Sequence, residues 1–159
     1  MATWSGIRKK LETEYLADAL RGRVQYYVTT YRKSHDQEGR AAILLDGQEV
    51  LKGNFYNYFL KEHFLDEKHK TDKWDIIDET MLDMGMFDQY SFYRSFDEYD
   101  NQSIENSLSS ENLLVRIFAV MDRRVGKRKI ISMMDHIEEE PSVFKFFYFV
   151  RLDAEGIRK

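Results

Sequence analysis

Residues 40–51 read RAAILLDGQEVL, two short apolar runs on either side of Asp46-Gly47. An Asp-Gly pair in this setting is a strong hairpin signal, because both central positions of a type I′ turn take a positive φ. The first run is apolar on both sides, which is typical of a central strand covered on both faces. We therefore expect an antiparallel hairpin with strands at 40–45 and 48–51.

The β pattern continues upstream of this hairpin. Residues 23–33 are rich in β-branched and aromatic types, such as Val24, Tyr27 and Thr29, which suit a pleated, half-buried surface. A polar connection at 34–39 joins this segment to the hairpin. Together the segments predict a short three-stranded antiparallel meander.

The chain before the meander has the spacing of a helix. Thr3 or Ser5 can cap its start, and Gly22 suits the left-handed position that ends a helix. Its apolar side chains recur at steps of three and four residues, at Trp4, Ile7, Leu11 and Tyr15. We expect this helix to pack across one face of the meander.

Downstream of Gly53 the pattern is helical throughout. The clearest helix starts at Ser109 or Ser110, and Gly126 is expected to end or bend it. A final helix after Pro141 is apolar nearly all round, so we expect it in the middle of the core. Further helices are expected at 54–68, 72–85, 87–99 and 130–137.

These patterns predict an α+β fold. An N-terminal helix and a short three-stranded antiparallel meander, residues 1–53, pack with a mostly helical C-terminal half, residues 54–159. A single domain of 159 residues is the expectation for this length, and folding it would bury ~70% of the surface of the unfolded chain.

Composition argues against several classes of protein. The chain has no Cys, which leaves no disulfide, no thiolate zinc site and no cysteine nucleophile. No window of about 18 consecutive apolar residues occurs, which argues against a signal peptide and a membrane span. By elimination we expect a cytoplasmic protein with no membrane partner.

The usual catalytic motifs are missing. G-x-S-x-G, P-loop and G-x-G-x-x-G patterns are absent. His63 and Glu67 are four residues apart and could share a helix face as metal ligands, but a solvated acidic helix explains them better. We expect ordinary structural histidines, and no catalytic residue, metal or cofactor. The four histidines are His35, His63, His69 and His136.

Negative charge is concentrated in the middle of the chain. Between Asn54 and Asp100 there are five Lys or Arg against twelve Asp or Glu, a balance of −7 within a total of −4. The same segment is rich in aromatic residues, which interfaces favour, and its charge would steer a basic partner. The alternative is that these rings fill the core. The net charge gives no support to nucleic acid as a ligand.

The densest basic run is Arg123-Arg124-Val125-Gly126-Lys127-Arg128-Lys129. If the preceding helix continues through Gly126, then Arg116, Arg123 and Lys127 lie within about 40° of one another around its axis. Such a ridge can hold a phosphate, a carboxylate or an acidic partner. The candidate anion- or partner-binding residues are Arg116, Arg123, Arg124, Lys127 and Arg128.

A structural explanation of the same cations stays open. Positive charges near a helix C-terminus are stabilised by the helix dipole, by ~0.3–1 kcal/mol each. Acidic residues nearby in the sequence can also pair with them. These are Asp122, Asp135 and Glu138–Glu140.

Six segments spread along the chain form a recognisable set: 4–8 (WSGIR), 20–26 (LRGRVQY), 30–32 (TYR), 100–104 (DNQSI), 115–128 (VRIFAVMDRRVGKR) and 147–156 (FYFVRLDAEG). Together these segments resemble a family of uncharacterised bacterial proteins. The similarity spans nearly the whole chain and implies a bacterial origin and a small stand-alone protein. It implies no activity, cofactor or substrate.

Two hypotheses about function follow. The first is a non-enzymatic protein-interaction module, comparable to small bacterial immunity or antitoxin proteins, whose acidic, aromatic-rich surface binds a basic protein. The second is a domain that binds an anion or a phosphorylated small ligand through the basic cluster Arg116–Arg128, with or without enzymatic activity.

Overall fold

The computed structural model describes residues 3–29, 39–53 and 76–157. Its strands are β1 (Val24–Val28), β2 (Ala41–Leu45) and β3 (Gln48–Lys52), and they form an antiparallel sheet in the order β1-β2-β3. Its α-helices are α1 (Trp4–Lys9), α3 (Glu79–Asp83), α4 (Gln89–Asp100), α5 (Ile104–Leu108), α6 (Leu113–Val120), α7 (Lys127–Met133) and α8 (Ser142–Ala154). Three further helical segments are η1 (Lys10–Glu14), a π-helix, and η2 (Asp18–Leu20) and η3 (Met134–Glu139), which are 3-10 helices. This arrangement confirms the predicted α+β class.

The hairpin forms as predicted. Asp46 and Gly47 take φ values of 51° and 86°, as a type I′ turn requires. Arg23 forms a two-bonded ion pair with Asp46, at 3.0 Å for both nitrogen–oxygen distances, and so ties the turn to the start of β1. The turn and its ion pair set the pairing of β2 with β3.

Only one face of the sheet is covered by described helices. Tyr26, Ile43 and Leu51 point inward and are each at most 5% exposed. On the outer face, Arg40 and Glu49 are paired and partly open to solvent. Ala42, which lies on the outer face beside Lys52, is nevertheless fully buried, whereas Leu44 and Leu45 are half-buried. The expectation that β2 is covered on both faces therefore holds for Ala41–Ile43 and not for the end of the strand.

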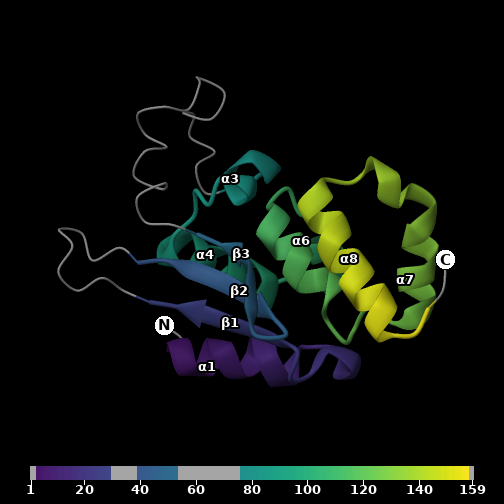
Figure 1. The fold of residues 1–159 in the computed structure, drawn as a ribbon, viewed down its shortest axis with the longest axis horizontal. Coiled ribbons are helices and arrows are strands. Elements are labelled where there is room, and N and C mark those ends of the chain that lie inside the picture. Colours follow the sequence, from purple (N-terminus) through teal and green to yellow (C-terminus); the bar gives the residue numbers. More distant parts are fainter. Residues whose placement is uncertain (1–2, 30–38, 54–75, 158–159) are drawn as a thin grey trace.

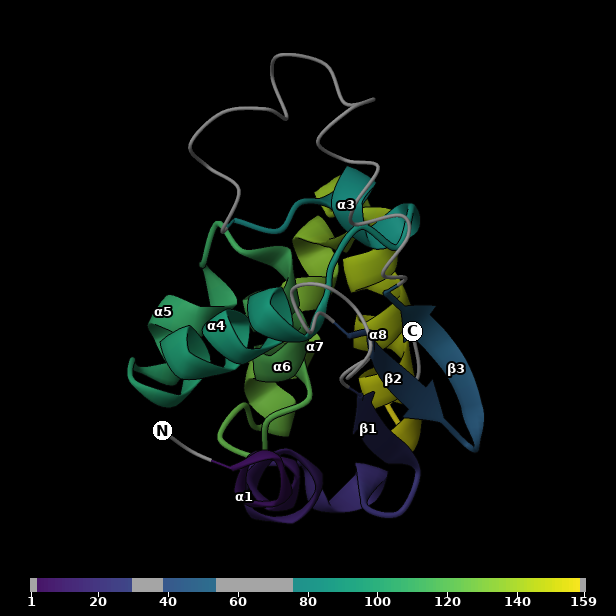
Figure 2. The same cartoon turned by 90° about the vertical axis from the view of Figure 1, so that its left-hand side faces the viewer.

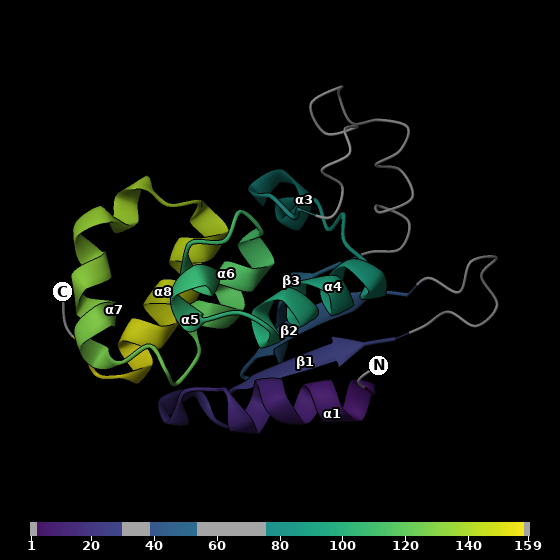
Figure 3. The ribbon, with the colours of Figure 1, turned by 180° about the vertical axis from the view of Figure 1, so that it is seen from behind.

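The helices and the sheet form two layers. Figure 1 shows α1 running beside β1, α4 behind the sheet, α6 between the sheet and α8, and α7 at the far end. Figure 2 shows the helices on one side of the sheet, and Figure 3 shows α4 and α5 from behind. The link from β3 to this layer is tight, because a Cβ on Gly53 would clash with the carbonyl oxygen of Phe87. None of the described helices is long and apolar enough to span a bilayer.

A cluster of aromatic rings joins the layers. The ring centroid of Phe118 on α6 lies 5.9 Å from that of Tyr26, 5.5 Å from Phe92 and 5.4 Å from Tyr99. Trp4 of α1 packs edge-on against Phe92 at 5.8 Å. Such edge-to-face pairs add to the stabilisation from burial alone. The cluster connects α1, β1, α4 and α6 in one core.

The central helix is α6 and not α8. Within Leu113–Val120, Arg116 is the one residue that is not buried. On α8, by contrast, Phe146 is 42% exposed, and Val143 and Val150 are half-buried. The expectation that the last helix lies in the middle of the core is therefore wrong.

Helix starts are set by capping side chains. Thr3 accepts a hydrogen bond from the backbone N–H of Gly6, as predicted. Asn112, rather than Ser109 or Ser110, caps α6 by accepting from Leu114 and Val115. Capping residues of this kind stabilise a helix by about 1 kcal/mol.

Two helix boundaries differ from the prediction. The first helix changes to a π-helical turn, with the N–H of Tyr15 donating to the carbonyl of Lys10 at 2.8 Å. The helix expected from residue 72 begins at Glu79, capped by Asp78, whereas residues 72–75 lie outside the described residues. The expected helix at 54–68 also lies outside them.

Candidate functional site

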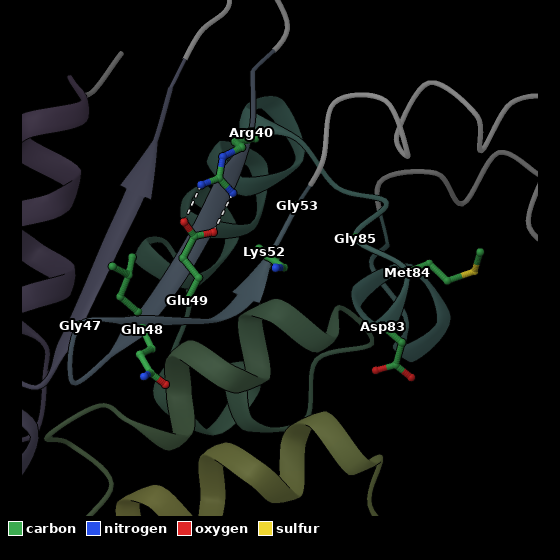
Figure 4. A pocket seen from close by; sticks show the side chains of 10 residues that line it. Arg40, Gly47, Gln48, Glu49, Lys52, Gly53, Asp83, Met84 and Gly85 are labelled. Atoms are coloured by element: carbon green, nitrogen blue, oxygen red, sulfur yellow. Dashed lines mark hydrogen bonds and ion pairs between the residues drawn. The ribbon is translucent and has the colours of Figure 1, made fainter.

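A cavity of about 880 Å³ lies on the outer face of the sheet, beside α3. Its most prominent group is an ion pair in which Arg40 donates to both oxygens of Glu49, at 2.8 and 2.6 Å (Figure 4). Lys52 lies beside this pair, whereas Asp83 on α3 points away from the sheet (Figure 4). The lining carries two cations, Arg40 and Lys52, against two carboxylates, Glu49 and Asp83, so its formal net charge is zero.

A second cavity, of about 580 Å³, has three arginines around it and is called here the arginine pocket. One wall comes from η1 and the chain that follows it, and the other from the turn between α6 and α7. Among its residues Arg21, Arg123 and Arg124 are basic, against two carboxylates. The lining residues are Thr13, Glu14, Tyr15, Arg21, Asp122, Arg123 and Arg124.

Backbone hydrogen bonds hold the two walls together. Leu16 and Asp122 form an antiparallel bridge. On either side of it, the N–H of Ala17 donates to the carbonyl of Met121 at 2.9 Å, and the N–H of Arg123 donates to that of Tyr15 at 2.8 Å. Two segments more than 100 residues apart in the sequence therefore meet in fixed register.

Arg151 on α8 shapes the turn that carries Arg123 and Arg124. Its side chain is only 3% exposed and pairs with Glu155 at 3.0 Å. Its guanidinium donates to the carbonyls of Val120 and Asp122, at 3.0 and 2.9 Å, and to that of Val125. These carbonyls lie at and beyond the end of α6, where a helix leaves acceptors without a partner. Arg151 thus replaces the next helical turn and fixes where the chain bends.

The buried carboxylate of Asp122 holds the guanidinium of Arg124. The Asp122 side chain is fully buried and accepts from Nε and Nη2 of Arg124, at 3.1 and 2.8 Å, and from the backbone N–H of the same residue at 2.7 Å. The hydroxyl of Tyr99 donates to its second oxygen. Both carboxylate oxygens are therefore occupied, which leaves no lone pair for use as a general base.

Two tyrosine rings support the same guanidinium. The carbon at the centre of the Arg124 guanidinium lies 5.4 Å from the ring centroid of Tyr15 and 5.9 Å from that of Tyr99. The Tyr15 hydroxyl donates to Asp100 at 2.6 Å, and Lys10 pairs with the same carboxylate at 3.3 Å. These contacts hold the Arg124 guanidinium in one orientation. Its third nitrogen, Nη1, makes no hydrogen bond to Asp122.

The pKa shifts keep the hydroxyls of this pocket protonated. Burial and the hydrogen bond to Asp100 raise the pKa of Tyr15 to about 12. Burial and the neighbouring Asp122 raise the pKa of Tyr99 still further. The hydrogen bond to Asp122 raises the pKa of Arg124 above its ordinary value. At neutral pH these groups act as a fixed cation and hydrogen-bond donors.

The predicted basic ridge does not form, because α6 ends at Val120. The expectation that Gly126 ends or bends this helix is wrong; Gly126 instead precedes the first residue of α7. Arg116 points elsewhere, pairs with Glu140 and stacks on the ring of Phe144 with its central carbon 4.3 Å from the centroid. Arg123 and Arg124 line the arginine pocket, whereas Lys127 and Arg128 are exposed in the first turn of α7.

The alternative explanation, that these cations serve the helix dipole or pair with nearby carboxylates, applies to some of them. Arg124 pairs with Asp122 and Arg116 pairs with Glu140, as that explanation allows. Lys127 and Arg128, however, lie at the start of a helix, where the dipole disfavours cations. Within the described residues, the side chain of Arg123 has no hydrogen bond or ion pair.

Sequence reasoning missed Tyr15 and Arg21 as pocket residues. The helical spacing places Tyr15 in the apolar stripe of the first helix, and nothing in the sequence singles out Arg21, the residue before Gly22. The π-helical turn brings Thr13, Glu14 and Tyr15 to the pocket wall, and π-helical turns are frequent at functional sites. No pattern in the sequence marks this change of helical pitch.

The acidic, aromatic-rich segment is described only in part. Residues 54–75, with Phe55, Phe64 and Trp74 among them, lie outside the described residues. The same is true of His63 and Glu67, which the sequence analysis considers as a pair of metal ligands. Of the described rings in this segment, most serve the core: Phe87, Phe92 and Tyr99 are at most 1% exposed, whereas Tyr90 is 40% exposed.

These features define the chain as a small α+β protein whose helical layer carries an arginine-lined pocket. By sequence it belongs to the SF0329 protein family, whose model matches residues 3–152. No curated protein and no solved structure matches the chain. The match covers nearly the whole sequence, and it includes both walls of the arginine pocket.

The raised pKa of Tyr15 predicts a loss of stability in alkaline solution. Above its ordinary pKa of 10.0 the unfolded chain releases the Tyr15 proton, whereas the native state keeps it up to about pH 12. The unfolded state then binds fewer protons, so the free energy of unfolding falls as pH rises through this window. Urea titrations at pH 9 to 12 should show a shallower fall for Tyr15→Phe than for the wild type.

The control for this experiment is Tyr90→Phe, which removes a hydroxyl from an exposed ring on α4. It should leave the pH slope of the wild type unchanged. Equal slopes for wild type and Tyr15→Phe would mean that Tyr15 titrates alike in the folded and unfolded states.

Proposed function

We propose that this protein binds a small anionic ligand, with a phosphate or carboxylate group, in the arginine pocket. Arg123 and Arg124 come from the basic cluster recognised in the sequence. Arg21 adds a third guanidinium from the opposite wall, where its Nε pairs with Asp18 at 3.4 Å and its Nη2 donates to the carbonyl of Thr13 at 2.9 Å. Guanidinium groups suit such ligands because their planar fork of donors matches the oxygens of a phosphate or a carboxylate. The volume of about 580 Å³ is within the usual range for small-molecule sites.

The observation that carries this proposal is the fixed orientation of Arg124. Asp122 and the rings of Tyr15 and Tyr99 hold its guanidinium while its side chain stays 44% exposed. A ligand therefore meets a cation that has already lost its rotational freedom, which reduces the entropic cost of binding. Next to it, Arg123 is exposed and has no partner among the described residues.

The pocket supports binding better than catalysis. The buried Asp122 has all its acceptor positions filled, and the tyrosine hydroxyls remain protonated at neutral pH. A general base needs a free lone pair and a pKa near the working pH. Apart from the carboxylate of Glu14, the exposed groups that line the pocket in the described residues are cations and hydrogen-bond donors, which is what anion recognition requires.

The test is a ligand screen followed by a single substitution. Inorganic phosphate, a sugar phosphate, a nucleoside monophosphate and citrate are added in low-salt buffer, and the melting temperature is measured. A ligand that binds the folded state raises it by mass action. For any ligand that does so, isothermal titration should show that Arg123→Gln raises Kd by about 10- to 100-fold, because a charge-assisted hydrogen bond contributes about 1.5–3 kcal/mol.

Arg123 is the cleanest position for this test, because its side chain has no structural contact among the described residues, whereas removing Arg124 would orphan Asp122. The matched control is Arg94→Gln, which removes a cation from the exposed face of α4. It should leave Kd within about twofold of the wild type, as surface charges away from the ligand contribute little. No shift of melting temperature with any of the four anions would refute the proposal.

The first hypothesis from the sequence, an interaction module with an acidic aromatic surface, stays a prediction. Five of the twelve acidic residues of its segment lie in residues 54–75, outside the described part of the chain.

A further inference from the structure

The charges along α7 and η3 stand in the reverse of the order that a helix favours. Lys127, Arg128 and Lys129 occupy the first turn of α7, with no acidic residue among them. Acidic residues follow in η3, at Asp135, Glu138 and Glu139. A helix dipole stabilises anions at the start of a helix and cations at its end. The order of charges along α7 and η3 therefore does not stabilise these helices, and it calls for another explanation.

An exposed apolar side chain lies midway between the two charged groups. Ile131 is 49% exposed, and it stands four residues after Lys127 and four before Asp135. Residues four apart along a helix are neighbours on its surface, and Lys127 and Asp135 are exposed as well. Half-buried Met134 adds an adaptable apolar side chain beside Ile131. The outer face of α7 and η3 therefore carries a basic group at Lys127, an apolar group at Ile131 and an acidic group at Asp135, in that order.

The charges nearest to Ile131 are not neutralised within the described part of the chain. There, the side chains of Lys127, Arg128 and Asp135 make no hydrogen bond or ion pair. Glu138 meets Lys145 at 3.4 Å and Glu139 meets His136 at 3.8 Å, but both glutamate side chains are 79% exposed. Such exposed pairs contribute little and exchange readily for other partners.

We infer that this face binds a second copy of the same chain, with the two α7–η3 segments antiparallel about a twofold axis. In that arrangement Ile131 meets Ile131 of the second copy at the axis. Lys127 lies opposite Asp135 of the second copy, and the symmetry repeats the pair, as a self-complementary twofold interface requires. The surface complementary to this face carries basic, apolar and acidic groups in the same order along an antiparallel helix. A second copy of this chain has that surface.

The position of α7 in the fold suits this contact. It lies at the end of the molecule away from the sheet, with its outer side turned away from the other described elements (Figures 1 and 3). One helix face from each copy buries less than the ~800 Å² per partner of a stable complex. The dimer is therefore weak, reversible and sensitive to salt.

Charge reversal tests the pairing directly. Lys127→Glu makes both ends of the face acidic, and Asp135→Lys makes both ends basic, so each variant alone repels its own copies. A mixture of the two variants restores both opposite-charge pairs. Sedimentation velocity of the full chain at about 50 mM salt should show dimers for the wild type and for the mixture, and monomers for each variant alone.

The expected size of the effect is at least about a tenfold rise in the dimer Kd for each variant alone, and about the same rise for the wild type at 0.5 M salt. The matched control mixes Lys9→Glu and Glu105→Lys, exposed charges on α1 and α5 that should leave the wild-type equilibrium unchanged. Circular dichroism establishes that every variant is folded.

Ile131→Ser supplies a second, charge-independent test. It should weaken the dimer without changing the folded state, because Ile131 is half exposed in the monomer. A wild-type chain that stays monomeric at low salt, or a dimer that ignores both charge reversals and Ile131→Ser, would overturn the inference. All of these substitutions spare Arg21, Arg123 and Arg124, so a failure here leaves the anion-binding proposal intact.

Discussion

Replacing Arg151 by Met is expected to lower the free energy of unfolding by about 3–5 kcal/mol, as loss of one partner in a buried ionic network does elsewhere. The substitution keeps most of the apolar stem but removes the guanidinium that binds the carbonyls of Val120, Asp122 and Val125. The carbonyls of Val120 and Val125 would lose this donor, that of Asp122 would keep only the N–H of Val125 at 3.1 Å, and the half-buried Glu155 would lose its ion pair. Urea unfolding of the full chain measures the loss.

The matched control is Arg128→Met, the same exchange at an exposed position on α7. It should change the free energy of unfolding by no more than about 0.5 kcal/mol. Arg151→Lys should fall in between, because an ammonium reaches fewer of the carbonyls than a planar guanidinium does. If Arg151→Met costs less than about 1 kcal/mol, the turn at 121–126 is held by something other than this side chain.

Asp122→Ala is expected to cost about 2–4 kcal/mol of stability, and it should also weaken anion binding. The buried Tyr99 hydroxyl loses its acceptor, and the Arg124 guanidinium loses both of its hydrogen bonds to the Asp122 carboxylate. The partial exposure of Arg124 lets water replace some of the lost contact, which places the cost at the lower end for a buried pair. Unfolding titrations and anion titrations on the same variant give the two quantities.

The comparison for this variant is Asp135→Ala, which removes a carboxylate from the surface of η3. It should leave stability within about 0.5 kcal/mol and anion affinity unchanged. A stable Asp122→Ala variant with full anion affinity would show that Arg124 does not depend on Asp122 for its orientation.

Local signals in the sequence were sufficient for the sheet. Asp46-Gly47 predicts a type I′ turn because few residue pairs tolerate two positive φ values, and no distant contact is needed to decide it. Thr3 likewise marks a helix start from its own chemistry. Gly22 takes the predicted left-handed conformation, but it follows the 3-10 helix η2, so the expectation that it ends the first helix is wrong. These features depend on the residue and its immediate neighbours alone.

The end of α6 depended on tertiary contacts and could not be predicted. The apolar spacing continues to Val125, so the helical pattern in the sequence runs past Val120. The chain leaves the helix because Arg151, about 30 residues further on, takes the carbonyls that another helical turn would have used. No local pattern encodes that competition.

Only part of the candidate site could be predicted from the sequence, because the rest of it is assembled by tertiary contacts. Arg123 and Arg124 stand out as a basic pair, but their neighbours Tyr15 and Arg21 are joined to them through the bridge between Leu16 and Asp122. A bridge between isolated residues leaves no periodic signature in the sequence. The other predicted cations, such as Arg116, were separated from the pocket once α6 ended early.

Nuclear magnetic resonance of the arginine side chains tests the central claim, that three guanidiniums form one anion site. The Nε–H signals of the full chain are followed during a titration with inorganic phosphate. The signals of Arg21, Arg123 and Arg124 should move together and saturate with one Kd, while that of Arg94 stays in place. Small, unsaturated movements spread evenly over all arginines would contradict the claim, because they would mean that phosphate only screens the surface.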